Sequence, residues 1–342
     1  MKSKIAGTAL VLLAGLALAS PAAAQEKLRV TLGSLGFLYT GVMAAELNGD
    51  FAAQGLDVEI TNAGSGSNNM AALIAGEANI TVTATSSVFR AREEELDLKI
   101  VGAAINQVAS NIVISADWAA EKGITAESSY EERLEALRGS TMGVTTPGSG
   151  TDQLIRYFAT EAGLNPDQDM TLATLGGTGG MVPSLERGVI NGYTASPPVP
   201  EVAVEEFGAV VLFDLIDGQV PALDGMMYQS VVARESYLAE NSDSVVRFLR
   251  GLQSALDAIH DPAQSDGIRD KVWEAYFNNT EKGLFDTIWA NFANAHAQSV
   301  EITAEQIDQV VAFQEAVGEP VTEEIRDAAW TNEYAAQAVA AP

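Results

Sequence analysis

The chain has 342 residues, no cysteine and a formal net charge of −27 at neutral pH. This length is sufficient for two domains with their own apolar cores, and the lack of cysteine excludes disulfides, thiolate metal ligands, cysteine nucleophiles and a cysteine-borne lipid anchor. The dispersed acidic charge argues against nucleic acid as a partner, because phosphate backbones are bound by clusters of Lys and Arg.

The N-terminal segment 1–24 is predicted to be a cleaved export signal, outside the fold. Lys2 and Lys4 precede an apolar run at 5–19, which is short for a membrane span, and alanines at 22–24 suit signal peptidase. The mature chain is therefore expected to start at Gln25 and to be periplasmic.

Strands alternate with helices in the next part of the chain. Runs of alternating or continuous apolar residues predict strands, and apolar residues three to four positions apart predict helices. Strands are expected at 28–32, 56–60, 79–83 and 98–105, and helices at 41–51, 70–75 and 87–95. This order favours right-handed βαβ units around a mostly parallel sheet.

A second α/β unit follows a strand at 111–115 that leaves the first. Its strands are expected at 141–145, 170–175, 190–194 and 209–213, and its helices at 130–137, 151–162, 181–187 and 199–206. An apolar segment at 226–232 is predicted to return to the first unit. The chain after 236 is predicted to be helical, with an Ala-rich tail after Glu333 that frays.

The two units share a repeated motif. The pattern L-x-x-G-x-x-N at 73–79 recurs at 185–191, and Val30 and Met142 open similar units at the same offset along the chain. The repeat predicts two lobes, one formed by 27–113 with 228–342 and one by 114–227. Two crossovers between lobes form a hinge, so we expect the lobes to close around a ligand.

Catalytic patterns are missing from the sequence. It contains no G-x-S-x-G nucleophile elbow, no G-x-x-x-x-G-K-[ST] phosphate-binding loop and no H-E-x-x-H zinc motif. The only histidines, His260 and His296, are interpreted as surface or helix-end residues. We therefore expect no enzymatic activity, no cofactor and no metal.

Small polar turns that precede helices are the candidate ligand contacts. In open α/β sheets, ligands lie beyond the carboxyl ends of the strands, and the free N–H groups of a helix N-terminus suit an oxyanion. The strongest candidate is the turn at 147–151, where Asp152 is interpreted as a first-turn acid. Phe37 and Tyr39 are expected to form an apolar wall, or else to cap the first lobe's core. Arg90 is expected to pair with Glu93 or Glu94. The predicted ligand contacts are Phe37, Tyr39, Ser65, Ser67, Thr85, Ser86, Ser149, Thr151 and Ser196.

Several segments resemble one family of binding proteins. Residues 44–60 are similar to its opening pattern A-x-E-x-G-x-F-x-x-x-G-L-x-V-E-I, and 72–80 and 185–191 to its A-L-x-x-G-x-x-D element, with Asn79 and Asn191 in place of the usual Asp. Residues 245–258 resemble its C-terminal helix. The family is that of the NMT1/THI5-like solute-binding proteins of ABC importers, which bind taurine, alkanesulfonates or thiamine precursors.

The resemblance implies a fold and a role. The fold would be α/β, a type II periplasmic-binding-protein fold of two lobes, each a mostly parallel sheet flanked by helices, with a C-terminal helical extension. The protein would be a monomer that captures a sulfonate, carboxylate or small heterocycle and delivers it to an inner-membrane ABC permease. A receptor that signals to a partner protein and a THI5-like pyrimidine-synthesis enzyme are the alternatives.

Overall fold

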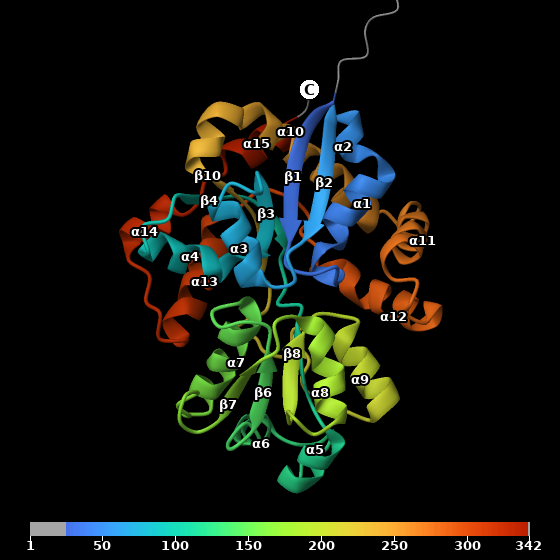
Figure 1. Cartoon of the computed structure of the whole chain (residues 1–342), viewed down its shortest axis with the longest axis vertical. Helices are drawn as coiled ribbons and strands as arrows, with labels where there is room; N and C mark the ends of the chain where they lie inside the picture. The colour runs from blue at the N-terminus through green and yellow to red at the C-terminus, as the bar shows by residue number, and fades with distance from the viewer. Residues whose placement is uncertain (1–24, 341–342) are drawn as a thin grey trace, which may run out of the picture.

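The computed structural model describes residues 25–340 and contains two separate five-stranded sheets (Figure 1). The predicted signal segment lies outside the described residues. The first sheet has the order β2-β1-β3-β10-β4. Its strands are β1 (Glu26–Leu32), β2 (Leu56–Asn62), β3 (Ile80–Ala84), β4 (Leu98–Ile105) and β10 (Gln229–Arg234).

The second sheet repeats this arrangement with the order β7-β6-β8-β5-β9. Its strands are β5 (Asn111–Ile114), β6 (Thr141–Val144), β7 (Thr171–Thr174), β8 (Gly192–Ala195) and β9 (Val210–Phe213). In each sheet four strands run in the same direction, and the fifth, the crossover strand β10 or β5, is antiparallel to both of its neighbours. We call each sheet with its flanking helices a lobe, and the prediction of a two-lobed α/β fold is confirmed.

The chain passes between the lobes before β5 and again before β10. The sequence prediction assigned 111–113 to the first lobe, but Asn111, Ile112 and Val113 pair with β8 and β9 in the second sheet. The crossing therefore lies at 106–110, where no strand pairing holds the chain, and the return lies at 214–228.

Helices flank both sheets. The first lobe carries η1 (Phe37–Tyr39), α1 (Thr40–Asn48), α2 (Asp50–Ala53), α3 (Gly66–Ile74) and α4 (Thr85–Glu93). The second carries α5 (Ala116–Lys122), α6 (Tyr130–Glu135), α7 (Gly150–Glu161), η2 (Thr178–Gly180), α8 (Met181–Glu186) and α9 (Val199–Phe207). Among residues 25–340, no helix is both long and apolar enough to cross a membrane.

The C-terminal third is helical, as predicted, and surrounds the first lobe (Figure 1). It comprises α10 (Glu235–His260), α11 (Ser265–Tyr276), α12 (Lys282–Phe292), η3 (Ala293–Ala295), α13 (Ala304–Ala316), α14 (Glu323–Ala328) and α15 (Glu333–Val339). The prediction that the tail frays after Glu333 is wrong, because Ala335 and Ala338 of α15 are buried, and their small side chains let this helix lie against α10. The rings of Tyr157 in α7 and Phe313 in α13 stack at 5.3 Å, so this region also contacts the second lobe.

The repeated motif has one structural role in both lobes. The side-chain oxygen of Asn79 accepts a hydrogen bond from the backbone N–H of Arg29 (2.9 Å), and that of Asn191 accepts one from Thr141 (2.7 Å). The N–H of each Asn donates in turn to the carbonyl of the same partner. Each Asn thus joins the start of one strand, β3 or β8, to its parallel neighbour, β1 or β6, which explains why the motif recurs with its strands.

Candidate functional site

Two helix N-termini meet between the lobes. Ser65 caps α3 and Ser149 caps α7, each accepting a hydrogen bond from the N–H three residues on. A Cβ placed on Gly66 would lie 3.7 Å from the Cβ of Ser149, so the two turns are in contact. The first N–H groups of both helices have no partner within their helix and carry partial positive charge.

These turns enclose a chamber of about 60 Å³. This is far below the usual volume of a drug-sized ligand site, roughly 300–1,000 Å³, and suits a small polar group. Among the residues that the structure describes, none with a charged side chain lines it. The lining residues are Gly33, Ser34, Leu38, Tyr39, Ser65, Gly66, Thr83, Ala84, Ser110, Thr145, Ser149, Gly150, Thr151, Thr178, Ala195, Ser196, Tyr228 and Gln229.

Two tyrosines provide neutral hydroxyl groups in the chamber wall. Burial raises the pKa of Tyr39 well above its usual range, and it raises the pKa of Tyr228 to about 12. The Tyr228 hydroxyl donates to the Ser110 Oγ at 3.1 Å, and the backbone of Gly33 hydrogen-bonds to the Tyr39 hydroxyl. Both side chains therefore stay uncharged at neutral pH and add no negative charge to the chamber.

Two buried polar atoms in the chamber wall have no hydrogen-bond partner among the described residues. They are the Thr83 Oγ1 and the Gln229 Oε1, on side chains that are 1% and 3% exposed. A buried polar group without a partner costs about 1–3 kcal/mol. A bound polar group could satisfy them, which makes the chamber a candidate binding site.

A wider groove of about 400 Å³ leads into the chamber. It shares Ser34, Thr178 and Ser196 with the chamber and is bordered by Leu35, by Pro198 and by glycine-rich turns of both lobes. A Cβ on Gly177 would lie 2.8 Å from the carbonyl oxygen of Gly64, so only glycine allows these two turns to meet. The groove could hold the organic body of a ligand whose polar end lies in the chamber.

Hydrogen bonds across the lobe boundary hold the halves together beside the chamber. The Arg90 guanidinium donates to the carbonyl of Gly148 (2.6 Å), and the Ser86 hydroxyl donates to the Gln153 Oε1 (2.5 Å). The Ser67 hydroxyl donates to the carbonyl of Pro147 at 3.1 Å. The expected pairing of Arg90 with a neighbouring glutamate is wrong, since its guanidinium reaches the second lobe instead.

The structure brings together five of the nine predicted ligand contacts. The five in the chamber wall are Tyr39, Ser65, Ser149, Thr151 and Ser196. Their contact with a ligand stays a prediction. Asp152 is 4% exposed and accepts hydrogen bonds from the N–H of Gly148 and the guanidinium of Arg156, as expected for a first-turn acid.

The other four predicted contacts lie elsewhere. Phe37 is fully buried with its ring 5.1 Å from those of Phe277 and Phe285, because η1 directs it into the aromatic core. Ser67 and Ser86 hydrogen-bond across the lobe boundary. Thr85 begins α4 and is 1% exposed, outside the chamber wall.

Sequence reasoning missed several residues of the chamber wall. Tyr228 and Gln229 come from the crossover that enters β10, and Ser110 comes from the opposite crossover. Thr83 and Thr145 lie at the carboxyl ends of β3 and β6, a few residues before predicted contacts, and Thr178 begins η2 in a glycine-rich turn. Strand ends could have identified Thr83 and Thr145, and the glycine-rich turn could have identified Thr178, whereas nothing local marks the crossover residues.

The described residues offer little for a metal or for imidazole chemistry. Between residues 25 and 340, no three His, Asp or Glu side chains are grouped to hold a metal ion. His296 lies at a helix end, as the C-cap of η3, but it is not on the surface, because it is 2% exposed and its Nε2 lies 2.9 Å from the Thr40 hydroxyl. Burial lowers the pKa of His296 to about 3, so it is neutral and structural.

Comparison with known proteins places this geometry in context. A family model described as the NMT1-like family matches residues 23–270. The protein YtlA of Bacillus subtilis (strain 168) is 21% identical over 286 residues, which cover 80% of this chain and 77% of YtlA.

Solved structures share the fold. The alkanesulfonate-binding protein SsuA from Xanthomonas axonopodis pv. citri, bound to MOPS, aligns with a TM-score of 0.71 at 14% identity over 90% of this chain and 99% of SsuA. The periplasmic nitrate-binding protein NrtA from Synechocystis PCC 6803 aligns with a TM-score of 0.75 at 14% identity, covering 92% of this chain and 89% of NrtA. At these identities the likeness establishes the fold.

Proposed function

The chain belongs to the NMT1-like family, and from this premise we propose that it is a periplasmic receptor that binds a small oxyanionic solute between its lobes. The observation that carries the proposal is the chamber wall, in which the described residues combine two helix N-termini with neutral hydroxyl groups and contribute no charged side chain. Such a site favours a carboxylate, a sulfonate or a small inorganic oxyanion, which N–H groups and hydroxyls can bind without a counter-charge.

The ligand's polar end would occupy the chamber and its organic body the adjoining groove. A charged group that is fully enclosed loses its hydrogen bonds to water, so the donors of the chamber wall must point at the ligand's oxygens to replace them. The free N–H groups of Gly150 and Thr151 and the hydroxyls of Tyr39 and Ser65 come from both lobes. A ligand that contacts both lobes binds the closed arrangement more tightly than the open one and shifts the population toward it.

Delivery to an inner-membrane ABC permease completes the proposed role. The solved structures of similar fold include the ligand-binding component of an ABC-type import system from Staphylococcus aureus. The closed, ligand-bound form presents a surface that differs from that of the open form, and a permease can distinguish the two. The absence of clustered Lys and Arg in the sequence agrees with a small solute rather than nucleic acid as ligand.

Isothermal titration calorimetry with ethanesulfonate, propionate, nitrate and bicarbonate tests the proposal. At least one should bind the wild type, and the double variant Ser149→Ala/Thr151→Ala should weaken that binding tenfold or more, because each lost hydrogen bond to a charged group costs about 1.5–3 kcal/mol. Binding of none of the four, or unchanged affinity in the double variant, would contradict the assignment.

The matched control is Ser129→Ala. Ser129 caps α6 in the second lobe through a capping box and does not line the chamber. Both it and Ser149 accept a hydrogen bond from the N–H three residues on, so each alanine should lower stability by about 1 kcal/mol. Thr151 also accepts one from the N–H of Thr145, which adds to the loss in the double variant. Only the Ser149→Ala/Thr151→Ala variant should lose affinity.

A further inference from the structure

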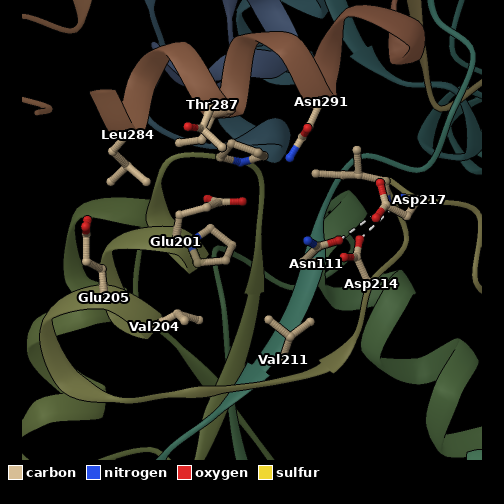
Figure 2. A pocket seen from close by; sticks show the side chains of 14 residues that line it. Asn111, Glu201, Val204, Glu205, Val211, Asp214, Asp217, Leu284, Thr287 and Asn291 are labelled. Atoms are coloured by element: carbon tan, nitrogen blue, oxygen red, sulfur yellow. Dashed lines mark hydrogen bonds between the residues drawn. The ribbon is translucent and has the colours of Figure 1, made fainter. Parts of the chain in front are cut away.

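A second cavity, of about 450 Å³, lies outside the chamber between α9 and α12 (Figure 2). Its walls come from α9 and the segment around β9 in the second lobe, and from α12 in the C-terminal region. It shares no residue with the chamber and only Pro197 with the groove. The volume falls within the range of small-molecule sites, roughly 300–1,000 Å³.

The lining of this cavity is acidic, whereas the chamber wall is made of neutral residues. Its lining includes the carboxylates of Glu201, Glu205, Asp214 and Asp217, and within the described part of the chain no Lys or Arg side chain lines it. Four acidic groups without a cation among them create a negative potential, which a concave wall strengthens. An anion is therefore excluded, and a cation is the complementary occupant.

Glu201 has an acceptor oxygen that nothing satisfies. Its Oε2 is buried and has no hydrogen-bond partner among the described residues. Figure 2 shows this side chain extending into the space beneath α12. Burial, with a smaller contribution from the negative charge of Asp214, raises the pKa of Glu201 to about 7. A buried carboxylate without a partner is costly, and a donor with positive charge would remove that cost.

Apolar side chains complete the walls. Val204, Val211 and Ile216 lie on the side of the second lobe, and Leu284 and Ile288 lie on α12. Such walls favour a ligand with a short hydrocarbon body in addition to its charged group. Thr287 and Asn291 of α12 border the same space, and Figure 2 shows the amide of Asn291 directed into it.

We propose that this cavity is a second binding site, for a small organic ammonium ion with a short aliphatic body. An N–H of the ammonium group donates to the Oε2 of Glu201, and the hydrocarbon body lies between α9 and α12. The proposal is independent of the oxyanion site in the chamber, since the two lining sets do not overlap.

Calorimetric titration of the purified protein with n-butylammonium chloride tests the proposal. The wild type should bind n-butylammonium and should bind neutral 1-butanol at least tenfold more weakly. Glu201→Gln keeps the shape but not the charge and should weaken n-butylammonium binding at least tenfold. The matched control Glu206→Gln changes an exposed carboxylate on α9 outside the cavity and should bind as the wild type does.

The pH dependence gives a second readout. A proton and the ammonium ion compete for Glu201, whose apo pKa is about 7, so affinity should be constant above pH 7 and fall about tenfold per unit below it. The groups that face Glu201 are Glu205 on α9, Asp214 and Asp217 after β9, and Tyr193 on β8, while α12 borders the cavity with uncharged residues. Glu201→Gln should flatten this dependence.

The result that overturns the proposal is n-butylammonium affinity that is equal in the wild type and Glu201→Gln, or equal to that of 1-butanol. If Glu201→Gln does not fold, Thr287→Trp substitutes for it, since this exposed α12 position borders the cavity and a tryptophan there fills it. Lost n-butylammonium binding in a folded Thr287→Trp supports the site, and retained binding overturns it. Retained oxyanion binding in these variants shows that the chamber is unaffected.

Discussion

The hydrogen bond from Arg90 to the carbonyl of Gly148 joins the two lobes but lies outside the chamber wall, so Arg90→Ala tests whether lobe closure contributes to binding. The bond is 2.6 Å long and its donor is charged and partly buried. Hydrogen bonds of this kind contribute about 1.5–3 kcal/mol, and partial exposure of the guanidinium reduces the value here to about 1–2 kcal/mol. The closed population relative to the open one should then fall by about 5–30-fold.

If the ligand binds the closed form, its apparent dissociation constant should rise by up to the same factor. Calorimetry measures the constant, and small-angle scattering should show a larger radius for the unliganded variant. The control is Arg29→Ala, which removes a similar bond from a guanidinium to the carbonyl of Gly76 (3.1 Å) within the first lobe. Unchanged affinity and radius in Arg90→Ala would refute the contribution of this contact to closure.

Three further predictions concern stability and processing. His296 has a folded-state pKa of about 3, below its unfolded value of 6.5, so the free energy of unfolding should fall as pH drops below about 6.5, by about 2 kcal/mol at pH 5. Urea unfolding at pH 7 and pH 5 should therefore show a larger loss of stability in the wild type than in His296→Gln. Equal losses in the two proteins would contradict this prediction. Asn79→Ala and Asn191→Ala should each destabilise the fold by about 1 kcal/mol, whereas Asn79→Asp and Asn191→Asp keep a hydrogen-bond acceptor and should cost less. Equal losses of stability in the Ala and Asp variants would argue against the hydrogen bonds to Arg29 and Thr141. Intact mass of the exported protein should correspond to a start at Gln25, and a retained N-terminus would contradict the cleavage prediction.

The overall fold could be predicted because it depends on local patterns that occur twice. The repeated Gly and Asn mark the start of β3 and of β8. The offset between Gly76 and Gly188 equals the offset between Arg29 and Thr141, the residues to which the two Asn side chains hydrogen-bond. Strand and helix periodicity then located most elements. The fate of the C-terminal tail could not be read locally, because α15 is held by its contact with the distant α10.

The candidate site was predicted only where local structure determines it. Ser65 and Ser149 are N-caps at the carboxyl ends of strands, so their positions follow from the turn pattern. Phe37 was misassigned because its surroundings come from the region of α11 and α12, which is remote from it in the chain. Tyr228 was missed for a related reason, since only the pairing of the crossover strand β10 with β3 brings it to the chamber.

The central claim is that a solute bound between the lobes closes them, and ligand-dependent energy transfer between the lobes tests it most directly. The chain has no cysteine, so a double variant Glu59→Cys/Glu186→Cys can be labelled at two exposed positions, on β2 of the first lobe and α8 of the second. With the oxyanion that binds in the calorimetric panel, transfer efficiency should rise to a plateau with a midpoint at the calorimetric dissociation constant. Unchanged efficiency at saturating ligand would contradict closure around a solute.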